Sequence, residues 1–384
     1  MKIALVVHDL HEHGGHSLYT KILADELSLN HEVTVFANRC ERAVNAGWSF
    51  RPVRAWRVNA LATVQTFPLG IKMHKARLGD YDIRHMQGYC GGQPNVVTAH
   101  ICVAAYLDSL RSISAHTRAS LTLMAAAESH FYRRYEGHVI AISQKIAREL
   151  RDFYQVQGEI SVIPHGVDAA RFASLNREQH RSSVRAELGI SSQETVALYV
   201  GDLTKAHTNL KALAEAGPEV QFIIVSRSVR YRWTMPNVRF LNPSTGLERY
   251  YAAADALVFP TTYDAFGMVV LEAMASALPV FTSDCAGAAE LIDHGMDGFV
   301  FSLNDWVEAT AAGLRDPDSL RTVGRQAEKT ASQHDWSTVA RQVEEVYGAI
   351  AVRDLRRSFP HKSDGREDVA IVNTFPLPSE GRRD

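Results

Sequence analysis

Residues 263–279 read Tyr-Asp-Ala-Phe-Gly-Met-Val-Val-Leu-Glu-Ala-Met-Ala-Ser-Ala-Leu-Pro, and this stretch decides the fold. An apolar run, Ala256–Phe259, precedes it, and a second, Val280–Thr282, follows it. Short apolar runs of this kind are typical of strands buried in a parallel sheet. Between them, Met268–Ala277 has the composition of a helix that stops before Pro279. The order of strand, turn, helix and strand predicts an α/β unit that handles a nucleotide.

Two carboxylates, Asp264 and Glu272, flank the turn at Gly267. Carboxylates accept hydrogen bonds from sugar or ribose hydroxyls, and the free N–H groups at a helix start attract an anion. Glycine in the turn lets the backbone approach a ligand closely. The alternative is that Asp264 is only a helix cap and Glu272 only a surface residue. The pair of acids within this strand pattern favours a ligand-binding role.

The composition limits what the chain can be. Its 384 residues are enough for two domains, and a net charge of −2 gives no general affinity for nucleic acid. Ile3–Val7 is too short for a signal peptide and indicates a first strand, and no segment has the length of a membrane-spanning helix. The cysteines lie far apart, without zinc or disulfide spacing, which predicts a cytoplasmic location: Cys40, Cys90, Cys102 and Cys285.

Strand and helix patterns alternate through the first half of the chain. The predicted strands are Ile3–Val7, Glu32–Phe36, Asp82–Met86, Asn95–His100 and His138–Ser143, and the predicted helices are His16–Leu29 and Gln144–Phe153. Another strand begins at Ile160 and ends at Pro164 and Gly166. These two residues mark an inter-domain hinge.

The second half repeats the alternation. Its predicted strands are Thr195–Asp202, Val220–Val225 and Val238–Leu241, and its predicted helices are Leu210–Ala216, Leu247–Ala254 and Trp336–Ile350. This pattern predicts two facing, doubly wound α/β domains. We expect an N-terminal domain over 1–165, a C-terminal domain over 166–335, a helix over 336–352 that packs back on the N-terminal domain, and a disordered tail over 353–384.

These landmarks together resemble the retaining glycosyltransferases of family 4, which have the GT-B fold. The resemblance runs from the Gly14-Gly15 loop to Trp336, and residues 252–280 carry its most specific motif. Residues 286–292 and 297–300 extend the motif. Members of this family move a sugar from a nucleotide-sugar to an acceptor with retention of the anomeric configuration.

The resemblance implies roles for individual residues. Asp264 matches the first acid of the family's acid-x7-acid pair, which contacts the donor sugar, although the family usually has glutamate there. Glu272 matches the second acid, which binds the nucleotide ribose. Backbone N–H groups around Ala265, Phe266 and Gly267 would meet the sugar and the distal phosphate.

The N-terminal domain contributes two further matches to the family. Gly14 and Gly15 match the family's glycine loop beside the diphosphate, although such a pair is by itself also typical of a simple turn. His100 matches a histidine near the donor sugar, and its alternative role is a strand-end histidine bonded to backbone.

The diphosphate-binding cations depart from the family pattern. The family has an arginine after the strand that here ends at Val200-Gly201, and a lysine several residues later, but Asp202 occupies the arginine position. A departing nucleoside diphosphate develops negative charge, so a cation is needed. Lys205 is the first candidate and Arg227 the second, and His207 lies near the lysine position. The alternative is that both cations are solvated surface charges.

The resemblance implies catalysis by positioning and charge stabilisation, without a protein nucleophile. The catalytic candidates are His100, Asp264 and Lys205. Asp80-Tyr81-Asp82 and Asp316-Pro317-Asp318 are interpreted as loop acids, so no metal and no cofactor beyond the nucleotide-sugar co-substrate is expected. Two other functions remain open, a non-catalytic nucleotide-sugar-binding protein and a sugar-nucleotide epimerase on the same fold. A nicotinamide dehydrogenase is disfavoured because no Gly-x-Gly-x-x-Gly follows the first strand.

Residues 39–77 interleave cations with apolar side chains. The cations are Arg39, Arg42, Arg51, Arg54, Arg57, Lys72, Lys75 and Arg77, and the apolar residues are Trp48, Phe50, Trp56, Phe67 and Ile71. This mixture suits a lipid-linked acceptor or a peripheral contact with the inner face of a membrane. The alternative is a solvated surface whose aromatic residues turn into the core.

Overall fold

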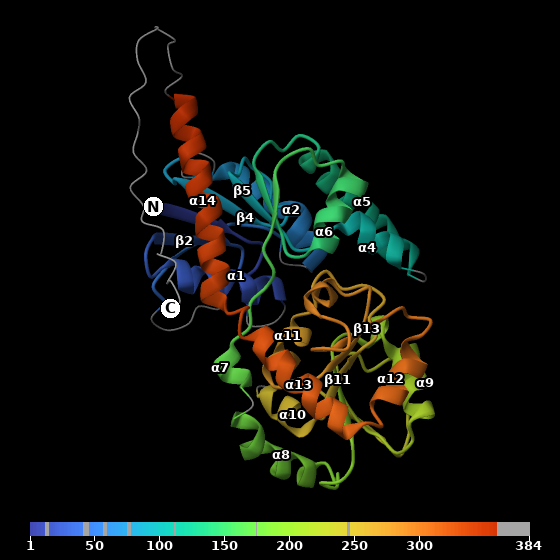
Figure 1. The fold of residues 1–384 in the computed structure, drawn as a ribbon. Coiled ribbons are helices and arrows are strands. Elements are labelled where there is room, and N and C mark those ends of the chain that lie inside the picture. Colours follow the sequence, from blue (N-terminus) through green and yellow to red (C-terminus); the bar gives the residue numbers. More distant parts are fainter. Residues whose placement is uncertain are drawn as a thin grey trace, which may run out of the picture.

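The computed structural model describes residues 1–11, 15–40, 46–56, 60–74, 78–110, 113–173, 175–243 and 246–358. These residues form two α/β domains, each built on one parallel sheet (Figure 1). The predicted class, two facing doubly wound domains, is confirmed. Because parallel neighbours cannot be joined by a tight turn, the chain crosses between strands mostly through helices.

The N-terminal sheet has seven strands in the order β3-β2-β1-β4-β5-β6-β7. Its strands are β1 (Lys2–Val6), β2 (Glu32–Ala37), β3 (Ser49–Pro52), β4 (Ile83–Gln87), β5 (Val96–Ala99), β6 (His138–Ala141) and β7 (Ile160–Val162). Strands β5 and β6 are buried at every residue, which explains their apolar sequences. The strand order reverses between β1 and β4, and ligands of such sheets bind outside the carboxyl ends at this point.

The helices of this domain are α1 (Gly15–Leu27), α2 (Ala60–Met73), α4 (Val103–Ser109), α5 (Ala115–Tyr132) and α6 (Gln144–Tyr154). Helix α6 begins at Ser143, whose hydroxyl accepts the N–H of Ile146. This is the usual N-cap geometry, which satisfies one free N–H of the first turn. This cap sets the residue at which α6 begins, and the first turn of α6 faces the C-terminal domain.

The C-terminal sheet has six strands in the order β10-β9-β8-β11-β12-β13. They are β8 (Val196–Val200), β9 (Gln221–Val225), β10 (Val238–Leu241), β11 (Ala256–Phe259), β12 (Val280–Ser283) and β13 (Phe299–Phe301). The helices are α7 (Ala169–Phe172), α8 (Leu175–Glu187), η1 (Leu203–Lys205), α9 (His207–Ala216), α10 (Glu248–Ala253), α11 (Met268–Ala275), η2 (Gly287–Leu291), α12 (Trp306–Gly313) and α13 (Pro317–Ala331). The strand order reverses here between β8 and β11, next to α11.

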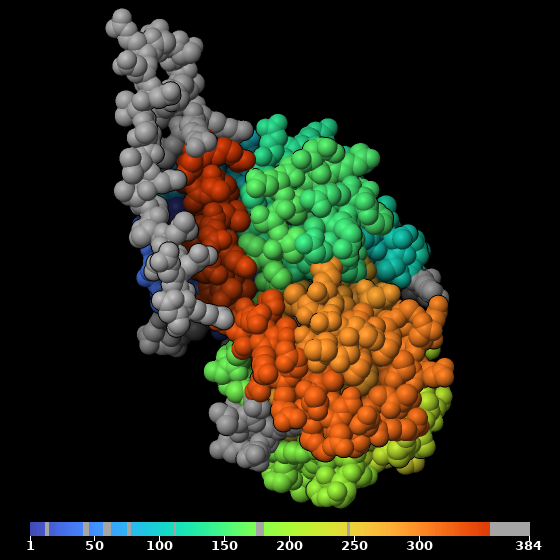
Figure 2. Space-filling model, in the orientation of Figure 1, coloured from blue at the N-terminus to red at the C-terminus, as the bar shows by residue number. Residues whose placement is uncertain are grey.

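The last helix, α14 (Trp336–Ser358), returns to the N-terminal domain and lies along α1 (Figures 1 and 2). Val343, Tyr347 and Ile350 are buried in the same apolar cluster as residues of β1 and α1. The helix continues beyond the predicted end at residue 352. The charged residues near 353 are compatible with a helix as well as with a loop. Residues 359–384 of the predicted tail lie outside the described residues.

The two chain crossings between the domains run side by side. Val167 N–H donates to the His334 carbonyl at 2.8 Å, and Val167 pairs with Asp335 as a parallel bridge. A Cβ atom on Gly166 would lie 2.9 Å from Trp336 Cδ2 and 3.0 Å from its backbone nitrogen. Only glycine allows this approach, because the crowding atoms belong to a buried ring and to backbone.

Gly166→Ala should therefore destabilise the protein by about 1–3 kcal/mol through overpacking at the crossings. Gly348→Ala is the matched control, because Gly348 is an exposed α14 residue with open space around its Cβ position. That substitution should stabilise the helix by about 0.5–1 kcal/mol. Thermal unfolding of both variants measures the difference, and equal midpoints would contradict this account of the hinge.

Candidate active site

The first residues of α1 and α11 meet between the domains. A Cβ atom on Gly15 would lie 3.2 Å from Met268 Sδ. Gly267, just before α11, has φ +93, and a Cβ there would lie 3.1 Å from Phe259 Cε1. The first turns of helices carry unpaired N–H groups and the positive end of the helix dipole. Two such ends close together favour an anion between the domains. Gly14 lies outside the described residues.

The Asp264 carboxylate lies in the turn that leads into α11. Its Oδ1 accepts the Phe266 N–H at 3.2 Å, so that N–H is already engaged within the turn. Burial raises the pKa of Asp264, while the charge of Lys205, the Phe266 N–H and the charge of Lys145 act against the rise. The charge of one lysine from each domain thus acts on the pKa of this carboxyl.

Glu272, the second acid, faces a different environment. Tyr251 Oη donates to Glu272 Oε2 at 2.7 Å. Burial raises the pKa of Glu272, and the Tyr251 hydrogen bond and the positive charge of Arg171 oppose the rise. The two acids thus have separate partners, as the predicted division between sugar and ribose requires. Their roles as donor ligands stay predictions.

The predicted cations are not equivalent. Lys205 Nζ lies 5.3 Å from the ring centre of Tyr106 and 5.9 Å from that of Tyr263, and its charge opposes the effect of burial on the pKa of Asp264. Arg227 is exposed, and no hydrogen bond or ion pair joins it to the described part of the chain. His207 points back to the Leu203 carbonyl, with Nδ1 at 3.1 Å. The structure places Lys205 near the ring of Tyr263, which precedes Asp264 in the chain, and leaves Arg227 at the surface.

Asp202, in place of the family's arginine, has a local structural role. Its carboxylate accepts the Thr204 N–H at 3.0 Å, the Thr204 hydroxyl at 2.7 Å and the Ser228 hydroxyl at 2.8 Å. Burial alone would raise the pKa of Asp202, but these hydrogen bonds and the charge of Lys205 lower it. Gly201 is required beside it, since a Cβ would lie 2.9 Å from Tyr199 Oη.

His100 lies in a partly buried cluster of histidines that the sequence did not indicate as a group. Its Nε2 bonds Gln87 Oε1 at 2.9 Å, and its ring centre is 4.3 Å from that of His16 and 5.6 Å from that of His165. His8 lies edge-on to His16 at 6.4 Å. Because His8, His100 and His165 follow β1, β5 and β7, the shared carboxyl edge of the sheet could have indicated the cluster.

Burial keeps these rings neutral. It lowers the pKa of His8 and His165 to about 3 and that of His16 to about 4, and it lowers the pKa of His100 well below its usual value. Both ring nitrogens of His165 and Nδ1 of His100 have no hydrogen-bond partner within the described ranges. The N-terminal side of the site therefore offers neutral imidazoles with spare hydrogen-bonding capacity.

Helix α6 joins the two domains along one polar seam. Ser143 Oγ donates to the Ala265 carbonyl at 2.9 Å. The main-chain N–H groups of Gln144 and Lys145 donate to the two oxygens of Glu290 at 2.6 and 2.5 Å. Figure 2 shows the domains in contact on this face, where orange atoms meet the green of α6. The Phe266 ring is buried on the same interface, 4.8 Å from the ring of His165.

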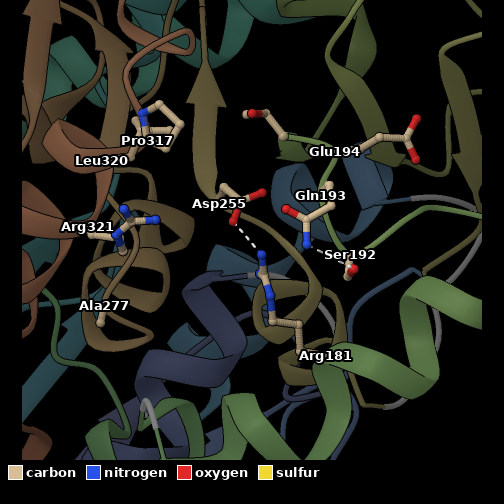
Figure 3. A pocket seen from close by; sticks show the side chains of 10 residues that line it. Arg181, Ser192, Gln193, Glu194, Asp255, Ala277, Pro317, Leu320 and Arg321 are labelled. Atoms are coloured by element: carbon tan, nitrogen blue, oxygen red, sulfur yellow. Dashed lines mark hydrogen bonds and ion pairs between the residues drawn. The ribbon is translucent and has the colours of Figure 1, made fainter.

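A separate hollow lies on the C-terminal domain, at the amino ends of β8 and β11 (Figure 3). Its lining includes Arg181 and Asp255, which form an ion pair at 2.6 Å. Arg185 Nη2 also binds Asp255 at 2.7 Å, and the Val196 N–H does so at 2.8 Å. The charged groups of the hollow are thus paired with one another. Ligands of parallel α/β sheets bind at the carboxyl ends of the strands, which lie at the opposite edge of the sheet. We assign this hollow a structural role.

One acid of each motif that was considered for metal binding has a backbone partner. Asp82 Oδ2 accepts the Lys2 N–H at 2.8 Å, and Asp316 caps α13 by accepting the Ser319 N–H at 3.0 Å. Within the described ranges, no group of three or more histidine, cysteine or acidic side chains is arranged to hold a metal.

The histidine cluster predicts a loss of stability in acid. As pH falls below about 6.5, these histidines bind protons in the unfolded chain but stay neutral in the folded protein. The free energy of unfolding therefore decreases. His165→Phe removes one such group and should reduce this slope by up to about 1.4 kcal/mol per pH unit between pH 6 and 4. Urea unfolding at several pH values measures it, with exposed His116→Phe as the control. A wild-type stability that is constant from pH 7 to 4 would contradict the prediction.

Comparison with known proteins identifies the family. A family model described as Glycosyltransferase Family 4 matches residues 13–171, and one described as Glycosyl transferases group 1 matches residues 194–316. The D-inositol 3-phosphate glycosyltransferase of Nocardia farcinica (strain IFM 10152) is 27% identical over an alignment of 306 residues, which covers 71% of this chain and 67% of that protein.

Two solved structures share the fold. Sucrose-phosphate synthase from Thermosynechococcus elongatus superposes with a TM-score of 0.75 and 22% identity, covering 92% of this chain and 99% of its own. Anabaena Alr3699/HepE in complex with UDP-glucose gives 0.68 and 19%, covering 91% and 100%. The chain is an enzyme of the glycosyltransferase family 4, with the GT-B fold.

Proposed function

We propose that this enzyme is a retaining glycosyltransferase that transfers a hexosyl group from a UDP- or GDP-sugar to a glycan, lipid-linked or small-molecule acceptor. The meeting of the α1 and α11 N-termini beside Asp264 and Glu272 carries the proposal. The donor diphosphate would lie at the helix ends, the ribose at Glu272 and the sugar at Asp264. His100 would contact the sugar from the opposite domain.

The reaction would break the bond between the anomeric carbon and the phosphate oxygen. The acceptor oxygen forms its bond to that carbon on the same face, and its proton passes to the departing phosphate oxygen. The products are the glycoside and a nucleoside diphosphate. Lys205 and the two helix ends would stabilise the charge that develops on the leaving group. No residue of the chain needs to act as a nucleophile.

The names of similar proteins guide the choice of substrates. One relative is named a D-inositol 3-phosphate glycosyltransferase, and one similar structure is a complex with UDP-glucose. UDP-glucose with phosphorylated polyols is therefore the first donor and acceptor set to test. The acceptor would enter from the N-terminal domain, past the neutral histidines.

Release of nucleoside diphosphate from a donor panel, with and without acceptors, tests the proposal. The coupling constant of the product's anomeric proton should equal that of the donor, and an inverted product would contradict a retaining mechanism. Asp202 in the arginine position favours one alternative, a nucleotide-sugar-binding protein without turnover. Donors that raise the melting temperature but never react would support it. An epimerase would convert the nucleotide-sugar without needing an acceptor.

Glu272→Gln should weaken nucleoside diphosphate binding roughly 10- to 150-fold, because a hydrogen bond to a charged group contributes about 1.5–3 kcal/mol. Titration calorimetry with UDP and GDP measures the change. Glu345→Gln, on the exposed side of α14, is the matched control. If the variant and the wild type bind the nucleoside diphosphate with equal affinity, Glu272 does not bind the ribose.

We also propose a peripheral contact with the inner face of a membrane, on a smaller surface than the sequence indicated. Trp48, Phe67 and Ile71 are buried, which corrects their predicted role in such a contact. The apolar side chains that remain exposed near α2 are Trp56 at 69%, Leu69 at 63% and Met73 at 84%. Beside them lie the exposed cations Arg51, Arg54 and Lys72. Arg42, Arg57, Lys75 and Arg77 lie outside the described residues, and no described helix is long and apolar enough to span a bilayer.

Trp56→Ser should reduce binding to anionic vesicles about ten-fold, through loss of an inserted aromatic side chain. Sedimentation at low and high salt measures binding. Leu123→Ser is the control, because Leu123 is 61% exposed but lies on α5. If the wild-type protein does not bind anionic vesicles at low salt, the proposed membrane contact is contradicted.

A further inference from the structure

Lys205 lies beside two tyrosine rings, one from each domain. Its Nζ atom is 5.3 Å from the ring centre of Tyr106, which lies on α4 of the N-terminal domain, and 5.9 Å from that of Tyr263, which belongs to the C-terminal domain. A cation at such a distance is attracted to the negative face of the ring. The two rings also contact each other, with centres 5.4 Å apart. Tyr106 therefore brings a side chain of the N-terminal domain into contact with the candidate diphosphate cation.

The start of α4 holds Tyr106 in place. Val103 N–H donates to Glu128 Oε2 at 3.1 Å, and Ala104 N–H donates to the Tyr154 hydroxyl at 3.0 Å. Tyr154 in turn donates to the same Glu128 oxygen at 2.7 Å. These bonds satisfy N–H groups of the first turn, which have no partner within their own helix. Because Tyr106 lies in this turn, its backbone is anchored to its own domain.

The other side of the contact is anchored to the C-terminal domain. The Lys205 carbonyl accepts the Thr262 N–H at 3.0 Å, which ties the end of η1 to the turn that leads to Asp264. Tyr263, the next residue of this turn, is only 4% exposed, and its hydroxyl donates to Glu149 Oε2 of the N-terminal domain at 2.8 Å. Each domain thus contributes one tyrosine that contacts a charged residue of the other.

The charge of Lys205 remains available to a ligand. Lys145 lies 3.6 Å from the centre of the same Tyr263 ring, but its ammonium forms an ion pair with Glu149. Within the part of the chain that the structure describes, the Lys205 ammonium has no hydrogen bond or ion pair. The neighbouring Asp202 carboxylate accepts its hydrogen bonds from two hydroxyls and an N–H group. A ring orients a cation without neutralising it, whereas a carboxylate would compete with a phosphate for it.

We propose that Tyr106 is a positioning residue of the donor site, which holds the Lys205 ammonium between the domains for the donor diphosphate. This inference rests on the proposed function, in which Lys205 stabilises the charge on the leaving group. A lysine side chain is long and flexible, so an ammonium without a partner samples many positions in water. Contact with a ring of the opposite domain favours the positions that lie between the domains.

Binding of nucleoside diphosphates tests the proposal. Tyr106→Leu removes the ring face, so the Kd for UDP or GDP should rise about 5- to 30-fold, the range of a partly enclosed cation–π contact. The Kd for uridine or guanosine, which carry no phosphate, should stay unchanged. Tyr106→Phe keeps the aromatic face and should bind the diphosphates within about two-fold of the wild type. Titration calorimetry measures the diphosphates, and ligand-observed NMR measures the nucleosides.

Tyr135→Leu is the matched control for the loss of a partly buried tyrosine ring. Tyr135 stacks on Phe131, and its hydroxyl donates to the His138 carbonyl at the amino end of β6. Ligands of such sheets bind at the carboxyl ends of the strands, which lie at the opposite edge. This variant should therefore bind diphosphates and nucleosides as the wild type does, even if its melting temperature falls.

A double-mutant cycle separates an action through Lys205 from an independent contact. In turnover of a UDP- or GDP-sugar, Tyr106→Leu should lower kcat about 5- to 30-fold. In a Lys205→Met background it should have no further effect, because the residue through which it acts is gone. Multiplicative effects of the two substitutions would overturn the inference. So would an unchanged diphosphate affinity in folded Tyr106→Leu, or equal weakening of diphosphate and nucleoside binding.

Failure of the proposed function gives a different result. A wild-type protein that binds a diphosphate but turns over no donor would contradict the proposed transfer reaction, while the binding data would still decide the role of Tyr106. A wild-type protein that binds neither UDP nor GDP would overturn the proposed function and this inference together.

Discussion

The contact between Gly15 and Met268 is the constraint on which the site depends. It brings the positive ends of α1 and α11 together, although they belong to different domains. A Cβ atom at position 15 would lie 3.2 Å from Met268 Sδ, so the Met268 side chain would have to shift to admit it. The packed crossings at Gly166 and Trp336, and the seam along α6, hold the domains at this distance. Anion binding at the meeting point of α1 and α11 therefore requires both domains in this arrangement.

The two sides of the cleft differ in their electrostatics. The N-terminal side presents neutral, buried histidines, while the C-terminal side presents two carboxylates and Lys205. Neutral imidazoles can donate and accept hydrogen bonds without attracting counter-ions. Such a surface suits a hydroxyl-rich acceptor, whereas the charged side suits a nucleotide diphosphate and its sugar. The asymmetry agrees with a donor and an acceptor that enter from different domains.

Much of the fold could be predicted from the sequence, because central parallel strands have unbroken apolar runs. Ala256–Phe259, in the middle of its sheet, agrees with β11 at both ends. Val238–Leu241 also agrees with β10 at both ends, although β10 is an edge strand and contains Arg239. Edge strand β3 was missed because Ser49–Pro52 is largely exposed and carries Arg51 and Pro52. Helix α5 was missed because small alanines give it a weak apolar periodicity.

The proximity of the candidate site residues could be inferred only where they are close in sequence. Asp264, Gly267 and Glu272 share one turn and helix, so their proximity could be inferred from spacing. Ser143 lies far from them along the chain, and only the fold brings its hydroxyl to the Ala265 carbonyl. Asp202 was identified as a departure, but its hydrogen bond from the Ser228 hydroxyl could not be predicted, because the fold brings Ser228 to it.

A crystal structure of the protein with a bound nucleoside diphosphate tests the central claim most directly. The account predicts that the diphosphate lies between the first turns of α1 and α11, with the ribose hydroxyls on Glu272. A diphosphate bound away from α11, for example in the hollow beside Arg181 and Arg321, would contradict it.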